Sequence, residues 1–180
     1  MRIRSGLLVL AFFYGCSSGW QAADHRVTSD NCELVPPDGW SMRSFENGSV
    51  LLTKDGLSLQ RIYLECSPVD SGFYFTQRLI VSGQSALEVS EAARDNIASH
   101  PGMTRFNLLE DSPVQIDGHE GFRLYYSAGN KEGGEWKGLL YGFVWKGQYY
   151  SISYEAVEPY YFERDSTAFE ATAQSLSVVR

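Results

Sequence analysis

Apolar and polar residues alternate with a period of two in several stretches near the start of the chain, and turn dipeptides separate them. The stretches are 40–45, 50–54 and 57–65, divided by Asn47-Gly48 and Asp55-Gly56. Because these dipeptides between alternating runs are typical of tight hairpins, the pattern predicts a three-stranded meander. In the third stretch, the pattern places Leu57, Leu59, Arg61 and Tyr63 on one face. Residues 73–81 are expected to form another extended segment.

The period changes after residue 84. Apolar residues then step by three, four and four positions, which places them on one helix face: Ala86, Val89, Ala93 and Ile97. Ser85 and Glu88 have the spacing of a capping box, and His100-Pro101-Gly102 supplies residues that end a helix. The sequence therefore predicts a helix between about Ser85 and Ser99.

Strand patterns return in the second half of the chain. Short strands are expected at 105–109 and 113–116, followed by alternating runs at 122–128, 139–145 and 150–156 with turns at Asp117-Gly118 and Lys146-Gly147. A last helix is expected within 162–176, with Thr167 and Glu170 as a second capping box and Phe169, Ala173 and Leu176 on one face. We predict an α+β fold in which flanking helices pack on a single twisted, mostly antiparallel sheet.

The first 15 residues are typical of a secretory signal peptide. Arg2 and Arg4 precede an uncharged apolar run, Gly6–Tyr14, and small residues follow it. The run is shorter than the roughly 20 residues that a membrane span needs, so we do not expect it to remain as an anchor helix.

Cys16 stands just after this run. The segment Phe13-Tyr14-Gly15-Cys16 resembles a bacterial lipobox, in which Gly15 fits and the two aromatic residues depart from the usual aliphatic and small pair. We expect Cys16 to carry acyl chains such as palmitate, which would hold the protein on a membrane. The alternative is ordinary cleavage after Gly19, which would discard Cys16 and leave a periplasmic protein. Ser17 and Ser18 follow Cys16 in place of an aspartate, which favours the outer membrane over the inner one.

These features divide the chain into a signal peptide at 1–15, a polar tether at 16–31 and one domain at 32–180.

The composition is globular, with 43% hydrophobic and 21% charged residues among 180. The formal net charge is -7, and removal of Arg2 and Arg4 with the signal makes it about -9. An acidic domain repels phosphate backbones, so nucleic acid is not an expected partner.

Cys32 and Cys66 remain in the predicted domain, 34 residues apart. Export places them in an oxidising compartment, where paired thiols become disulfides. A disulfide that closes this loop stabilises a domain by about 3.8 kcal/mol. Two free buried thiols are the alternative. A metal-binding pair is less favoured, because neither cysteine has a Cys or His within four residues.

Motifs of catalysis are absent from the sequence. It contains no Gly-x-Ser-x-Gly and no glycine-rich phosphate loop, so we expect no enzyme and no cofactor. The turn formed by Asp117, His119 and Glu120 has residue types that bind cations, but a polar hairpin turn explains it more simply, and no metal site is predicted.

Aromatic residues crowd the last part of the chain, between 136 and 162. If helices cover both sheet faces, these residues are core. If one face is partly open, some would form a binding surface near the loops 129–135 and 155–161, because Tyr and Trp are favoured at interfaces. The candidates for that surface are Tyr125, Trp136, Tyr149, Tyr160 and Tyr161.

The order of motifs resembles a known fold. A Pro36-Pro37-Asp38-Gly39-Trp40 entry, a hairpin, a helix over 85–99, the run Ile116–Arg123, an aromatic strand pair and a final helix ending in Ser175 are similar to the PsbP-like fold, and within it to the DcrB-like bacterial envelope lipoproteins. The resemblance covers residues 33–179. It implies an antiparallel sheet flanked by helices and a non-catalytic role, such as photosynthetic subunit, GTPase binder, effector chaperone or envelope lipoprotein.

Three functions follow, in order of preference. The first is a non-catalytic envelope lipoprotein that binds a partner protein, in assembly, as a chaperone or as an immunity-type protein. The second is a periplasmic binder of a small ligand or metal. The third, and least favoured, is an enzyme whose site is scattered along the chain.

Overall fold

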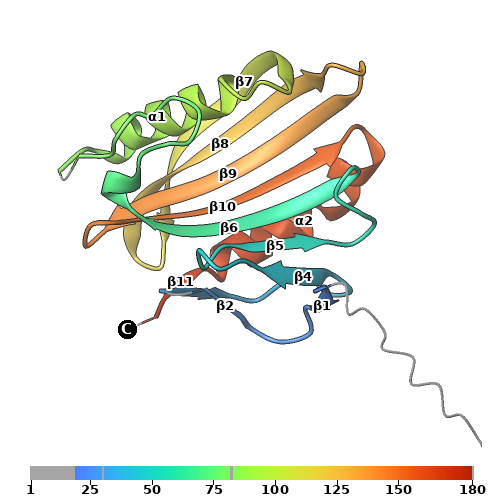
Figure 1. Cartoon of the computed structure of the whole chain (residues 1–180), viewed down its shortest axis with the longest axis horizontal. Coiled ribbons are helices and arrows are strands. Elements are labelled where there is room, and N and C mark those ends of the chain that lie inside the picture. Colours follow the sequence, from blue (N-terminus) through green and yellow to red (C-terminus); the bar gives the residue numbers. More distant parts are fainter. Residues whose placement is uncertain (1–18, 30, 82, 180) are drawn as a thin grey trace, which may run out of the picture.

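The computed structural model describes residues 19–29, 31–81 and 83–179. The predicted signal peptide and Cys16 lie outside the described residues. Most of the described chain belongs to one large sheet with a helix on each face (Figure 1). The predicted α+β fold is therefore confirmed.

Eight antiparallel strands form the large sheet in the order β1-β4-β5-β6-β10-β9-β8-β7. The strands are β1 (Gln21–Ala22), β4 (Ser41–Ser44), β5 (Val50–Thr53), β6 (Gln60–Pro68), β7 (Met103–Ile116), β8 (His119–Asn130), β9 (Glu135–Trp145) and β10 (Gln148–Val157). Short turns join most neighbours. In the turns Asp117-Gly118 and Lys146-Gly147 both residues have positive φ, between 48° and 76°, as the tight hairpins of twisted sheets require.

Three strand predictions need correction. β6 begins at Gln60, so Leu57 and Leu59 belong to the turn before it. Residues 73–81 form no strand, because the chain reverses there around Gln77, whose φ is 56°. The two short strands expected at 105–109 and 113–116 are parts of the single strand β7, which keeps its pairing to β8 across two register shifts.

The predicted tether over 16–31 also differs from the structure. Residues 21–22 form β1, which pairs with β4, and residues 27–29 form β2 (Val27–Ser29). Ala23 and Val27 are buried in the core, so residues 19–29 of this segment belong to the domain. Its strands are too short to show a periodic pattern in sequence.

A second, small sheet has the order β11-β3-β2, with β3 at Cys32–Leu34 and β11 at Ser177–Val178. This sheet brings the first and last parts of the described chain together. The predicted disulfide is present: Cys32 of the small sheet and Cys66 of β6 are joined, with an S–S distance of 1.97 Å. The bond therefore links the two sheets covalently.

Helix α1 (Ala86–Ala98) begins as predicted. The Ser85 hydroxyl accepts from the Glu88 amide, and the Glu88 carboxylate accepts from the Ser85 amide, which completes the capping box. Helix α2 (Tyr160–Gln174) differs, because it starts at Pro159 without a side-chain cap and passes through Thr167. The second capping box was therefore wrong. No helix within the described residues, α1 and α2 included, is long and apolar enough to span a membrane.

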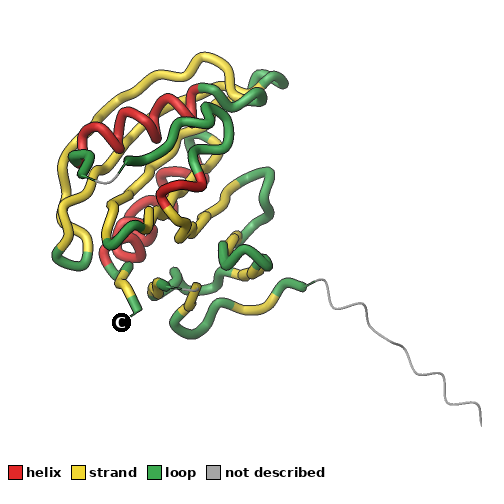
Figure 2. The backbone as a smooth tube through the Cα atoms, turned by 60° about the vertical axis from the view of Figure 1, so that its left-hand side comes forward, coloured by secondary structure: helices red, strands yellow, loops and turns green. Residues whose placement is uncertain are grey.

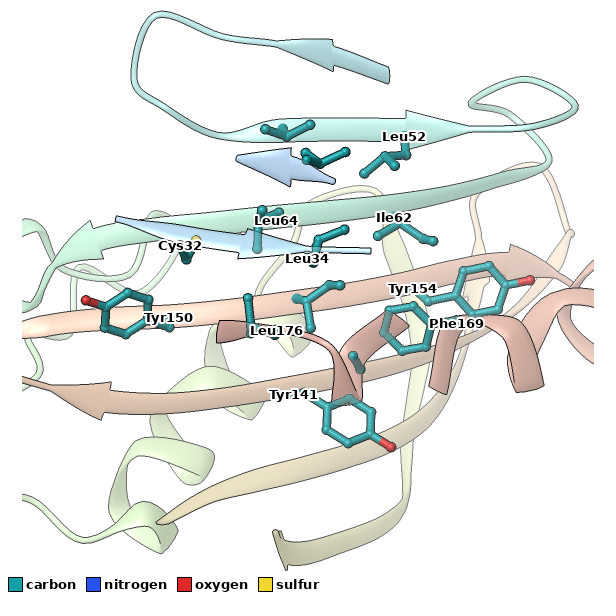
Figure 3. Packing of buried hydrophobic residues seen from close by; sticks show 14 of the residues in the cluster. Cys32, Leu34, Leu52, Ile62, Leu64, Tyr141, Tyr150, Tyr154, Phe169 and Leu176 are labelled. Carbon is teal, nitrogen blue, oxygen red and sulfur yellow. The ribbon is translucent and has the colours of Figure 1, made fainter. Parts of the chain in front are cut away.

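The two helices pack on opposite faces of the sheet, with α1 in front of the strands and α2 behind them in Figure 1. Figure 2 shows the same arrangement turned by 60°. Alternation sends Ile62, Leu64 and Tyr154 toward α2, where they pack with Phe169 and Leu176 (Figure 3). Ile152 and Ala173 belong to the same core. The other face carries a smaller core between α1 and the sheet, which includes Val89, Ala93, Phe122 and Leu124. Most of the crowded aromatic residues are therefore core.

Candidate functional site

The face of the sheet that carries α1 is only partly covered. The helix contacts β7, β8 and β9. At the far end of β10 and β6, the loop over residues 69–81 covers the sheet: Val69 donates its amide to Gly147, and Phe73 packs edge-on against Tyr149 at 5.4 Å. The opposite end of β6 and β10, around Arg61 and Glu155, is left open. We call this part of the sheet the open face.

A polar row crosses four neighbouring strands on the open face. Tyr126 of β8, Gly138 of β9, Glu155 of β10 and Arg61 of β6 stand side by side in register. The Tyr126 ring extends over Gly138, where a Cβ would lie 2.1 Å from Tyr126 Cζ, and its hydroxyl donates to Glu155 Oε1 at 2.7 Å. Arg61 donates to Glu155 Oε2 through Nε at 2.7 Å and also through Nη2. Tyr126, Glu155 and Arg61 are therefore linked by hydrogen bonds across the four strands.

Burial and charge determine how this row titrates. Tyr126 is fully buried, and its burial together with the adjacent Glu155 carboxylate raises the pKa of the phenol well above its ordinary value of 10. The phenol therefore stays protonated and keeps donating to Glu155. On the same face, burial raises the pKa of the Glu65 carboxyl, while a hydrogen bond with Ser67 partly offsets that rise.

Two adjoining hollows lie beside the row. The first encloses about 160 Å³ and is bordered by Arg61, His100, Met103, Asn130 and Trp136, among others. The second encloses about 260 Å³ and adds the side chains of Tyr63, Phe75 and Ile97. Arg61, His100, Met103 and Glu155 border both, so the two hollows form one depression in the open face.

Aromatic side chains frame this depression. The Arg61 guanidinium lies 5.4 Å from the centre of the Trp136 ring, a distance at which cation–π attraction acts. On the other side, the rings of Phe75 and His100 pack edge-on at 4.7 Å. The depression therefore combines a charged pair with aromatic walls, the composition that energetic centres of interfaces favour.

The five predicted surface residues do not form one surface. Trp136 lies on the open face. Tyr149 is 5% exposed and packs under the loop 69–81, so its inclusion was wrong. Tyr125 points to the α2 face, where it stacks on Phe162 at 5.8 Å. Tyr160 and Tyr161 stand at the start of α2 beside Arg164.

The three side chains of the candidate cation turn, Asp117, His119 and Glu120, also do not point to one place. Asp117 accepts a hydrogen bond from the Val178 amide at 3.0 Å, and His119 stacks on Phe143 and packs against Trp145 at a tilt. Glu120 follows His119 in β8 and therefore points to the opposite sheet face. The described residues contain no group of three or more His, Cys, Asp or Glu side chains placed to hold a metal ion.

A second polar network lies on the α2 face. Arg123 of β8 donates to Tyr141 and to Glu170, both at 2.9 Å, and pairs with Glu110 at 3.1 Å. Burial opposes protonation of Arg123, but the hydrogen bonds with Glu170 and Tyr141 outweigh it and raise the pKa of the guanidinium. This network joins α2 to the sheet. It also explains Glu170, which binds across the fold in place of capping its own helix.

Sequence reasoning missed the open face, since Arg61 and Glu155 are 94 positions apart. One local signal pointed to it: β6 alternates buried Gln60, Ile62 and Leu64 with the larger, partly exposed Arg61 and Tyr63. An arginine and a tyrosine on the second face of a central strand indicate that this face is not fully covered.

Comparison with known proteins identifies the fold. No family model matches the chain, and no curated protein sequence is similar to it. Among solved structures, cyanobacterial PsbP from Synechocystis sp. PCC 6803 is similar with a TM-score of 0.61 and 16% identity, covering 97% of this chain and 100% of that one. The fold is therefore PsbP-like, as the resemblance in the sequence implies.

Two further structures support this assignment. The Ran-binding protein Mog1p of Saccharomyces cerevisiae has a TM-score of 0.57 at 12% identity, covering 84% of this chain and 97% of its own. LpqN of Mycobacterium tuberculosis, which is involved in cell envelope biogenesis, has a TM-score of 0.54 at 13% identity, covering 87% and 90%. At these identities the likeness concerns the fold and not the residues of the open face.

Proposed function

We propose that this protein is a non-catalytic envelope lipoprotein of the DcrB-like kind, and that it binds a partner protein through the open face. The observation that carries the proposal is the uncovered depression around Arg61, Tyr63 and Trp136, three residue types that dominate binding energy at protein interfaces. The fold supports it, because one protein of similar structure is Ran-binding and another is involved in cell envelope biogenesis.

The polar groups of the open face favour binding over catalysis. Glu155 accepts from both Arg61 and Tyr126, so the carboxylate is engaged. A general base has to be free to take a proton from a nucleophile or from water. Within residues 19–29, 31–81 and 83–179, the arrangement at this face stabilises an ion pair and activates no nucleophile.

The membrane anchor is the second part of the proposal. With Cys16 acylated, the strand β1 would begin only five residues later, at Gln21. An extended chain advances at most about 3.6 Å per residue, so the anchor would hold the domain within about 18 Å of the bilayer surface. The lipoprotein would therefore work close to its membrane, with the outer membrane favoured by Ser17 and Ser18.

Site-specific crosslinking tests the binding role. A photoreactive phenylalanine analogue replaces Tyr63 on the open face or, as the matched control, Tyr160 at the start of α2, which is 62% exposed. Irradiation of intact cells should produce one discrete crosslinked species from position 63 and none of that mass from position 160. The same species from both positions, or from position 160 alone, would contradict the proposal.

Lipid labelling tests the anchor separately. Labelled palmitate should enter the protein and should be lost in Cys16→Ala. If the native protein takes up no label, the proposed anchor is wrong, and the proposed binding surface is unaffected by that result.

A further inference from the structure

The hydrogen-bonding groups that border the depression are unevenly used, and this imbalance identifies a ligand chemistry. In the first hollow, the carboxylate, amide and imidazole acceptors of the side chains are occupied. Both oxygens of Glu155 accept from Tyr126 and Arg61. Asn130 Oδ1 accepts from the amides of Glu132 and Gly134 at 3.0 and 2.7 Å. His100 Nδ1 accepts from the Gly102 amide at 3.0 Å.

The donor groups of Asn130, His100 and Arg61 differ, because each of these side chains keeps one donor without an acceptor in the described chain. Because two main-chain amides donate to Asn130 Oδ1, the Nδ2 group is the free end of that side chain. Because His100 Nδ1 accepts a hydrogen bond, the proton of the neutral ring sits on Nε2. Arg61 uses Nε and Nη2 for Glu155, and its Nη1 has no acceptor within the described chain. The three side chains that carry these donors, Arg61, Asn130 and His100, all border the first hollow.

The remaining lining is apolar. Met103, Ala128 and the ring of Trp136 border the first hollow, whose volume of about 160 Å³ suits a single compact side chain or ring. The second hollow continues from it past Tyr63, Phe75 and Ile97. A ligand that fills the depression therefore needs an acceptor group at the donors and an apolar body beside it.

From this geometry we infer that the depression is a binding site for a carboxylate carried on an apolar body. A carboxylate offers two oxygens to the Arg61, Asn130 and His100 donors, and hydrogen bonds between charged groups are stronger than those between neutral ones. The inference rests on the proposed function and deepens it: the partner would insert a chain end with an apolar last residue. A free organic acid is the other source of the same chemistry.

Matched acid and amide probes test this inference. The probes are 3-phenylpropionate with 3-phenylpropanamide, and acetyl-Ala-Ala-Phe with a free or an amidated C-terminus, titrated into the ¹⁵N-labelled protein and followed by NMR shifts. The acids should bind at least about tenfold more tightly than their amides, the difference expected for a hydrogen bond to a charged group. The tighter acid identifies the source, chain end or free acid.

Asn130→Asp supplies the decisive variant. It keeps the acceptor for the Glu132 and Gly134 amides and replaces the free donor with a negative oxygen, so acid binding should fall at least about tenfold. Asn107→Asp makes the same charge change at an exposed position of β7 and should change nothing. Equal binding of acid and amide, no binding of either acid, or undiminished binding by Asn130→Asp would overturn the inference.

The two proposals fail in different ways. A partner crosslinked at Tyr63 whose affinity is unaffected by Asn130→Asp would remove the carboxylate site and keep the proposed function. Acid binding that Asn130→Asp abolishes, in a protein that yields no crosslink at Tyr63, would keep the site and contradict the partner-binding role.

Discussion

The Tyr126 ring lies directly over Gly138, its in-register neighbour on β9, and reaches Glu155 on β10 with its hydroxyl at 2.7 Å. Only a residue without a side chain leaves room for this crossing. The carboxylate that Tyr126 reaches is also the one that holds Arg61 on the open face. The shape of the candidate binding site therefore depends on a glycine in the middle of a central strand.

Removing the Tyr126 hydroxyl should destabilise the protein. Tyr126→Phe leaves the ring in place and takes one donor from the largely buried Glu155, a loss expected to cost about 1–3 kcal/mol of unfolding free energy. Urea denaturation measures it. Tyr74→Phe, at a tyrosine that is 80% exposed, is the matched control and should have no effect. Equal stabilities for the two variants would show that the hydroxyl contributes nothing to the row.

Adding a side chain at Gly138, beneath the Tyr126 ring, should also destabilise the protein, here through a steric clash. A Cβ at Gly138 would lie 2.1 Å from Tyr126 Cζ, so Gly138→Ala must displace the ring and should cost about 1–3 kcal/mol. The same substitution in a Tyr126→Leu background should cost much less, because the clash is removed. A double-mutant cycle by urea denaturation compares the two costs, and additive effects would contradict the close approach.

Glu65 gives a pH-dependent prediction. Burial raises the pKa of this carboxyl above its ordinary value of 4.5, so the folded state resists its ionisation more than the unfolded state does. Ionisation of Glu65 therefore destabilises the folded state. This destabilisation is complete at a pH above the pKa of Glu65 in the folded state and vanishes below about 4.5. Glu65→Gln should therefore stabilise the protein at pH 7, and the gain should fade as the pH falls toward 4.5.

The control for this prediction is Glu132→Gln, which changes an exposed carboxyl of the loop between β8 and β9. At pH 7, urea denaturation should give the same stability for that variant as for the native protein, because the side chain is exposed. A series from pH 4 to pH 7 measures the gain for Glu65→Gln. A gain for Glu65→Gln that grows on acidification would reverse the assigned sign.

The bond between Cys32 and Cys66 joins the small sheet to β6, and both cysteines are buried. A Cys32→Ser, Cys66→Ser double variant should lose about 3.8 kcal/mol, the loop-closure value for 34 residues. Thermal and urea unfolding measure this loss. A reducing agent should destabilise the native protein by a similar amount and leave the double variant unchanged.

How far the sequence predicts this fold depends on how local each signal is. Ser85 and Glu88 are three residues apart, and their capping box is confirmed because each side chain accepts a hydrogen bond from the main-chain amide of the other residue. Thr167 and Glu170 have the same spacing, but Glu170 binds Arg123 of β8 and Tyr141 of β9. A tertiary contact of this kind overrides a local motif, and the motif itself does not reveal it.

The open face shows the same limit. Tyr126, Gly138, Glu155 and Arg61 form a row only through the register of four strands, and no single segment contains the pattern. The residues of the predicted aromatic surface do not lie together for a related reason: Tyr125 and Tyr149 have side chains on opposite faces of the sheet. Alternation predicts two faces for each strand, whereas the helices and loops decide which part of a face is left open.

The most direct test of the account is the affinity of the partner captured at Tyr63 for two variants of the protein. Tyr63→Arg changes the floor of the open face, and Tyr160→Arg makes the same change at the exposed start of α2. Isothermal titration calorimetry should show at least a tenfold loss of affinity, about 1.4 kcal/mol, for Tyr63→Arg and native affinity for Tyr160→Arg. Native affinity for Tyr63→Arg together with a loss for Tyr160→Arg would place the interface elsewhere and contradict the account.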